Sequence, residues 1–151
     1  MTITNTEMTI RLVLAMLVGT LVGFERTKKN KPAGIRTHAL VCIGSTLFTL
    51  VSAYGFSDFI NMENADPGRI AAQIVSGVGF LGAGIIWKEG YNVRGLTTAA
   101  NIWITAGLGM ALGLGLYWPV LVSVCLVFIT LTINDLLKKI GVIEYESESK
   151  G

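Results

Sequence analysis

The sequence predicts an all-α, polytopic membrane protein. We expect a bundle of five transmembrane helices with the N-terminus outside and the C-terminus in the cytoplasm. Hydrophobic residues make up 52% of the 151-residue chain and charged residues only 15%, and the mean hydropathy is +0.61. That balance is typical of membrane proteins and unusual for a water-soluble domain.

Five apolar runs are the second observation, and they cover residues 8–24, 39–56, 70–87, 98–117 and 118–137. Each is roughly 17–20 residues long, and as a helix it would measure about 26–30 Å, close to the thickness of the hydrocarbon layer. Backbone groups inside lipid must hydrogen-bond within the segment, so we expect helices. The first run is followed by Glu25 and Arg26 rather than by a small-residue cleavage site, which predicts a retained helix.

The remaining helix ends carry their own signals. Asp66 is a suitable cap for the third helix, and Pro67 suits the first helical position. We expect Thr97 or Thr98 to cap the fourth helix. Aromatic residues and a proline, at positions 117–119, favour a break between the last two helices at a membrane interface.

The distribution of basic residues is the third observation, and it sets the expected orientation. Ten of the twelve Lys and Arg residues follow the first and third runs or lie in the tail: Arg26, Lys28, Lys29, Lys31, Arg36, Lys88, Arg94, Lys138, Lys139 and Lys150. Connections rich in Lys and Arg remain in the cytoplasm. We therefore expect a transmembrane domain over residues 1–137 and a short cytoplasmic tail over 138–151. The basic link 26–36 serves topology on this view, although it could also bind anionic lipid headgroups.

Several function classes are disfavoured. The net charge of +2 gives no indication of nucleic-acid binding. Cys42 and Cys125 lie in apolar runs, which favours free buried thiols over a disulfide. No metal-ligand spacing, nucleotide loop or catalytic motif is present, so we expect no cofactor, no metal site and no enzymatic activity. The middle third of every run also lacks ionisable residues, which ion pathways usually contain.

Glycines are concentrated in the third run, where Gly77, Gly79 and Gly82 match the pattern G-x-G-x-x-G. A dinucleotide site would need a preceding strand and a following acidic residue, and neither is indicated here. We predict instead that Gly77, Gly79, Gly82 and Gly84 allow close helix packing, as small residues do in membranes. The packing partner could belong to the same chain or to another copy.

Polar residues gather at both ends of the predicted bundle. The candidate inner cluster consists of Glu25, Arg26, Arg36, His38, Arg94, Thr97, Thr98, Asn101 and Trp103. Helix ends are often polar only because headgroups are hydrated, but an amide one turn inside a span usually needs a partner helix.

The candidate outer cluster consists of Asp66, Arg69 and Gln73. It is either a helix cap with an ion pair or the mouth of a site that leads inward along Gln73 and Ser76.

Three blocks resemble the MgtC/SapB family of bacterial inner-membrane proteins. They are GFER with AGIRTH at 23–26 and 33–38, DPGRIAAQ with GFLGAG at 66–73 and 79–84, and GLTTAANIW at 95–103. The resemblance implies a multi-pass inner-membrane protein linked to magnesium limitation and to virulence or stress adaptation. It also marks Glu25, Arg26, Arg36, His38, Asp66, Arg69, Gln73, Asn101 and Trp103 as candidate functional residues. Longer members add a soluble C-terminal domain, so this chain resembles the short form.

Two functional hypotheses follow. The first is a non-catalytic regulator that contacts a membrane-protein partner, or a second copy of itself, through its helices in cells short of magnesium. The second is a transporter or channel for Mg²⁺ or another small solute, which the polar clusters at opposite ends of a glycine-lined stretch would suit. The glycine-rich faces and the absence of charge at mid-depth favour the first.

Overall fold

The structure is a computed structural model and describes residues 3–55 and 68–141. It contains five helices and one β-hairpin within those residues. In chain order they are α1 (Asn5–Lys28), α2 (Ile35–Tyr54), α3 (Gly68–Ala83), β1 (Trp87–Glu89), β2 (Asn92–Arg94), α4 (Leu96–Gly113) and α5 (Tyr117–Lys139). The all-α prediction is therefore confirmed. Most of the predicted tail, residues 142–151, lies outside the described residues.

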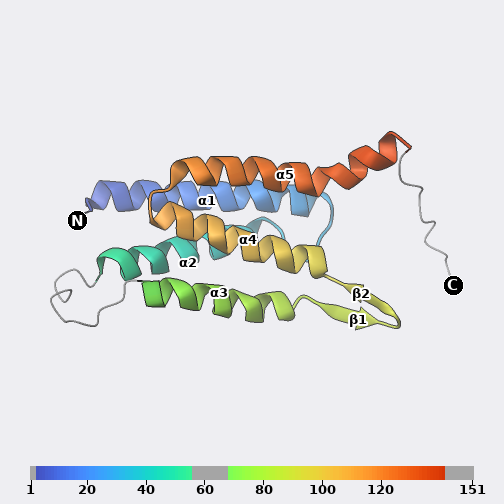
Figure 1. Cartoon of the computed structure of the whole chain (residues 1–151), viewed down its shortest axis with the longest axis horizontal. Coiled ribbons are helices and arrows are strands. Elements are labelled where there is room, and N and C mark those ends of the chain that lie inside the picture. The colour runs from blue at the N-terminus through green and yellow to red at the C-terminus, as the bar shows by residue number, and fades with distance from the viewer. Residues whose placement is uncertain (1–2, 56–67, 142–151) are drawn as a thin grey trace.

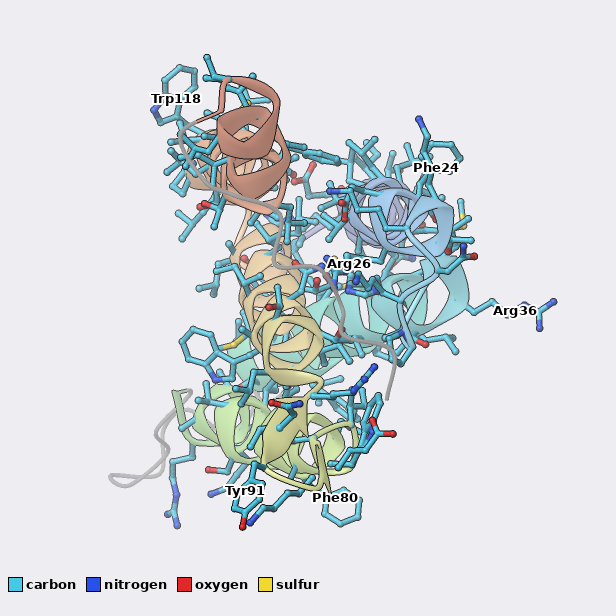
Figure 2. The ribbon with its side chains drawn as sticks, turned by 90° about the vertical axis from the view of Figure 1, so that its right-hand side faces the viewer. Phe24, Arg26, Arg36, Phe80, Tyr91 and Trp118 are labelled. Atoms are coloured by element: carbon cyan, nitrogen blue, oxygen red, sulfur yellow. The ribbon has the colours of Figure 1, made fainter. Side chains whose placement is uncertain are left out.

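The helices lie side by side along the long axis of the molecule and alternate in direction (Figure 1). Helix α4 is central and contacts each of the other four helices. Viewed along the bundle in Figure 2, α5 and α3 lie on opposite sides of α4, and α1 and α2 lie together on a third side. We name the two ends of the bundle after buried arginines. The Arg11 end contains the start of α1, and the Arg26 end contains its last turns.

Close contacts among α1, α2 and α4 build the core. Its larger apolar cluster contains Ala15, Val22, Cys42, Leu108, Leu112 and Val120. Glycines bring the backbones together: a Cβ atom on Gly19 would lie 2.6 Å from the His38 carbonyl oxygen, and one on Gly109 would lie 2.4 Å from that of Cys42. A second cluster, which includes Ile74, Val78 and Ile102, joins α3 to α4.

Membrane-crossing length is met by three helices in the described part of the chain. Helices α1, α2 and α4 are long and apolar enough to cross a bilayer, and α5 has a shorter apolar portion, Tyr117–Ile133. Helix α3 has 16 residues, or about 24 Å, which is less than the usual hydrocarbon thickness of about 30 Å. The structure thus supports a polytopic helical protein without establishing five spans.

The third apolar run does not form one continuous helix, so the predicted element 70–87 is wrong at its C-terminal end. Helix α3 ends at Ala83, and Trp87 begins a short hairpin in which it pairs with Arg94. Gly90, with a φ of 61°, lies in the two-residue turn between the strands. Because that turn favours a positive φ, glycine there directs the chain into a hairpin.

The predicted caps of the third and fourth helices have different outcomes. Asp66 and Pro67 lie outside the described residues. Helix α4 is capped by neither Thr97 nor Thr98, since its N-cap is Gly95, which makes no side-chain cap bond. Gly95 has a φ of 90°, and a Cβ atom there would lie 2.1 Å from the Ile85 carbonyl oxygen. Only glycine fits this position, where the hairpin passes over the start of α4.

The break between α4 and α5 lies slightly before the predicted position. Helix α4 ends at Gly113, and Gly115 follows with a φ of 76°. The Gly115 amide donates to the Leu112 carbonyl, and the Leu116 amide donates to that of Ala111. This is the Schellman pattern, in which a left-handed glycine ends a helix. Tyr117 then begins α5, so the aromatic residues at 117–118 lie inside its first turn.

Paired alanine substitutions on α4 would test the close approach of α2 and α4. We expect Gly109→Ala to destabilise the protein by about 1–3 kcal/mol, the usual range for overpacking, because the new methyl group meets the α2 backbone. Gly107 has open space where its Cβ would be, so Gly107→Ala should be neutral or slightly stabilising. Thermal unfolding of the purified protein in detergent measures both, and equal stability of the two variants would contradict the described packing.

Candidate functional site

The Arg26 end contains a buried polar cluster formed by α1, α2 and α4. Glu25 and Arg26 come from the last turns of α1, His38 from the first turn of α2, and Thr98 and Asn101 from the start of α4. All five are buried, with exposed fractions of 9% or less. Figure 2 shows Arg26 in the interior, between the ribbons of these helices.

Arg26 connects α1 to α4 in this cluster. Its Nη2 donates to Thr98 Oγ1 at 3.2 Å, and its Nη1 lies 3.6 Å from Glu25 Oε2. Lys29 Nζ lies 2.8 Å from the other Glu25 oxygen. One buried carboxylate therefore faces two cations, which compensates its charge as a buried carboxylate requires.

His38 and Asn101 connect α2 to α4. His38 Nδ1 lies 2.9 Å from the Gly34 carbonyl oxygen, which can only accept, so Nδ1 carries the proton. Nε2 then accepts from Asn101 Nδ2 at 3.2 Å. This assignment describes a neutral imidazole whose tautomer is fixed by the helix start that carries it.

Some polar atoms of the cluster have no hydrogen-bond partner within the described chain. They are both carboxylate oxygens of Glu25 and Nε of Arg26. The Glu25–Lys29 contact is therefore an ion pair without hydrogen-bond alignment. Buried polar atoms are nearly always hydrogen-bonded in native proteins. These three atoms are thus the buried polar atoms of the cluster whose hydrogen-bonding capacity the described chain does not use.

Four residues of the predicted inner cluster do not join it. Arg36 is exposed and projects away from the bundle (Figure 2). Arg94 pairs with Glu89 at 2.7 Å within the hairpin, because the two strands place these side chains together. Thr97 and Trp103 are exposed on α4. Trp103 lies on the side of the helix opposite Thr98 and Asn101, whereas Thr97 shares a side with Asn101 but lies in the exposed first turn.

The predicted outer cluster is described only in part. Asp66 lies outside them, and Arg69 and Gln73 are exposed on α3. Because α3 packs on α2 and α4, its exposed face points away from the core.

A different polar cluster occupies the Arg11 end. Arg11 is 9% exposed and donates from Nη1 to the Gly113 carbonyl at 2.6 Å and to the Tyr54 hydroxyl at 3.2 Å. Its Nε pairs with Glu7 Oε1 at 3.0 Å, and the Tyr117 hydroxyl donates to the same oxygen. Arg11 thereby joins α1, α2, α4 and the start of α5.

The sequence predicted no functional role for Arg11, which is one of the two basic residues outside the links and tail that we expect in the cytoplasm. Two signals could have identified it. An arginine inside an apolar run generally requires a partner, and Glu7 precedes Arg11 by four residues, so both lie on one helix face.

Buried hydroxyl groups lie between the two clusters, along the contact of α2 with α4. Thr46 Oγ1 donates to the Gly109 carbonyl at 2.8 Å, Thr49 to that of Ser45, and Thr105 to that of Asn101. These groups are satisfied by backbone, and Gly109 and Gly113 leave no space beside them. We name this row of buried hydroxyls, Thr46, Thr49 and Thr105, the polar seam. It is a tightly packed helix contact and not an open path. The residues described here also contain no cluster of His, Cys, Asp or Glu that could hold a metal ion.

The predicted packing glycines in and just after α3 differ in what surrounds their Cβ positions. Gly82 is buried, and its Cβ position lies 3.6 Å from Ala99, so it faces α4. Gly84 follows the end of α3 and lies near carbonyls of its own helix. Gly77 and Gly79 have nothing within 4 Å of their Cβ positions. Of the two partners considered for these glycines, the same chain or another copy, no described part of this chain packs on them.

Replacing Arg11 by leucine should destabilise the protein by about 1.5–3 kcal/mol, the range for losing a hydrogen bond that involves a charged group. The loss removes bonds to two other helices, α2 and α4, while Glu7 is partly exposed and can be rehydrated. Arg36→Leu removes the same charge from an exposed site and should have little effect. Unfolding of both variants in one detergent checks this, and equal stability would contradict a structural role for Arg11.

Comparisons with known proteins agree with the architecture. The model of the MgtC family matches residues 12–140. A relative from Escherichia coli K12, named "Putative magnesium transporter YhiD", is 51% identical over 113 residues, which cover 74% of this chain and 53% of that protein. "Protein MgtC" of Salmonella typhimurium LT2 is 47% identical over 130 residues, covering 86% of this chain and 52% of the relative. No solved structure matches significantly.

A third relative, "Protein MgtC" of Brucella abortus 2308, is 45% identical over 138 residues, or 91% of this chain and 54% of its own length. The chain thus spans about half the length of the curated relatives it matches. The membrane-length helices and these similarities make it a multi-pass inner-membrane protein. The family match extends over most of the chain, and the chain belongs to the MgtC family.

Proposed function

We propose that the protein is a non-catalytic membrane regulator in magnesium-related physiology, and that it acts by contact of α3 with another membrane helix. The observation that carries this proposal is the outward face of α3. Ala72, Ser76, Gly79 and Ala83 are all exposed, and their spacing of four, three and four residues aligns them on one side of the helix. We name these four residues the small-residue face.

The small-residue face suits close approach by a second helix. No described atom lies within 4 Å of the Cβ position of Gly79, and Phe80 beside it is 81% exposed. Phe80 points away from the bundle in Figure 2. Small residues let membrane helices approach closely, and a flanking aromatic ring supplies a large contact area. The partner is either a second copy or another membrane protein, and the proposed association with magnesium rests on the relatives' names.

We also propose that the five helices cross the membrane with the N-terminus outside and the C-terminus in the cytoplasm. Their alternating direction (Figure 1) and the basic residues at the Arg26 end support this orientation. The short α3 would then thin the bilayer locally or be flanked by its polar ends. Stress adaptation and virulence would be consequences of the regulatory role.

Cysteine cross-linking in native membranes tests the small-residue face. In a Cys125→Ser background, we expect Ser76→Cys to form a disulfide-linked adduct under mild oxidation, because Ser76 faces the partner. Cys42 is buried and should not react. Gly107→Cys, on an exposed part of α4, is the matched control and should form far less adduct. If neither a dimer nor a hetero-adduct forms specifically at Ser76, the proposal fails.

Transport of Mg²⁺ or another small solute is the second candidate. The polar seam favours it, because buried hydroxyls continue from Asn101 to Arg11 through the α2–α4 contact. Transport would require α2 and α4 to separate, since the seam is closed by Gly109 and Gly113.

Flux into liposomes separates the two candidates. If the protein is a regulator, Mg²⁺ uptake should equal that of empty liposomes. Uptake above that background that is lost in Asn101→Ala would instead establish transport through the seam. The Arg36→Ala variant, altered at an exposed site, serves as the control for insertion and folding.

A further inference from the structure

An apolar groove lies on the outside of the bundle between α2 and α3. Its volume is about 500 Å³, and its lining includes Leu40, Gly44 and Phe48 from α2 and Gln73, Gly77 and Leu81 from α3. Gly44 and Gly77 have nothing within 4 Å of their Cβ positions. The groove therefore exists because two facing helices lack side chains at these two positions.

The dimensions of the groove fit a thin occupant. The lining of α3 extends from Ile70 to Leu81, which corresponds to about 16 Å of helix. An extended acyl chain is much thinner than a helix and suits a lining that is almost entirely apolar.

Charge is placed at one end of the groove. Arg69 directly precedes Ile70, is exposed, and forms no ion pair with any described residue. Gln73 lies one turn further along the same helix, in the groove lining. A guanidinium and a primary amide at the mouth of an apolar groove match a phosphate attached to a hydrocarbon chain.

We propose that the α2–α3 groove binds an anionic phospholipid, with one acyl chain between Gly44 and Gly77 and its phosphate at Arg69 and Gln73. The lipid fills space that the protein leaves open and holds α3 against α2. This inference goes beyond the proposed function, because the groove and the small-residue face lie on different sides of α3.

Native mass spectrometry of the full chain in detergent tests the proposal, with phosphatidylglycerol and phosphatidylcholine as probes. The unaltered protein should retain one phosphatidylglycerol in preference to phosphatidylcholine. Gly77→Leu and Gly44→Leu should each lower its occupancy at least about fivefold, since about 1 kcal/mol corresponds to that factor. Gly79→Leu on the same helix, and Gly107→Leu on α4, should leave occupancy unchanged because both glycines are open but lie outside the groove.

A second pair of variants tests the end of the groove where Arg69 lies. Arg69→Gln should lower phosphatidylglycerol occupancy about fivefold and remove the preference over phosphatidylcholine. Lys88→Gln, exposed on β1 and outside both the groove and the basic link 26–36, should change neither. Thermal unfolding of each leucine variant shows whether it has kept its fold. Because Gly44 and Gly77 are tested separately, loss of fold in one variant leaves the other as a test of the groove.

Three outcomes would overturn the proposal: equal retention of the two lipids by the unaltered protein, unchanged occupancy in a folded Gly77→Leu variant, or equal losses in Gly77→Leu and Gly79→Leu. If Gly77→Leu abolished a cross-linked dimer while lipid occupancy stayed constant, the groove would belong to a second copy instead. Cross-linking at Ser76 is scored separately, so failure of either proposal leaves the other intact.

Discussion

The close approach of α2 and α4 is the constraint on which the rest of the structure depends. Gly109 and Gly113 bring the α4 backbone so near to α2 that even a methyl group would meet Cys42 or Thr49. This contact places Asn101 beside His38 at one end, and at the other end it places the Gly113 carbonyl where Arg11 can bond to it. It also removes water from the threonine hydroxyls between them, which then bond to backbone. Both polar clusters are therefore consequences of one helix contact.

Both polar clusters contain a buried arginine that joins α1 to other helices, but their polar atoms differ in how they are hydrogen-bonded. The guanidinium of Arg11 bonds to a carboxylate, a tyrosine hydroxyl and a backbone carbonyl, so this cluster resembles a structural clamp. At the opposite end, Glu25 is neutralised by ion pairs but receives no hydrogen bond from the described chain. A site with compensated charge and free hydrogen-bonding capacity can respond to a ligand, whereas a clamp resists change. If the chain has a responsive polar site, the structure favours the Arg26 end.

Much of the fold followed from composition and periodicity, because five apolar runs leave few alternatives to helices in a membrane. The hairpin after α3 could not be inferred from hydropathy, since Trp87 is as apolar as the helix before it and only the Gly90 turn redirects the chain. Glu25, Arg26, His38, Thr98 and Asn101 were predicted together because helix ends meet. Arg36 and Trp103 lie on the outer sides of their helices, and the sequence alone did not show which side faces the bundle. Of the glycines expected to pack, Gly82 faces α4, whereas Gly77 and Gly79 have no neighbour within the described residues and their packing on another chain stays a prediction. The close contacts at Gly19 and Gly109 were not predicted, because the sequence does not show which glycines face a neighbouring helix.

The Arg11 clamp also has a consequence for the order in which the protein is assembled. Arg11 lies in α1, and the Gly113 carbonyl that accepts its hydrogen bond lies 102 residues later in the chain. The space for its guanidinium is shaped by the left-handed turn at Gly115, where a Cβ atom would lie 2.7 Å from Nη2. Until α4 has been inserted and has turned, the guanidinium of Arg11 lacks this carbonyl acceptor and needs another polar partner. The Arg11 contacts therefore form only after α2 and α4 have come together with α1, so they depend on segments distant in the chain.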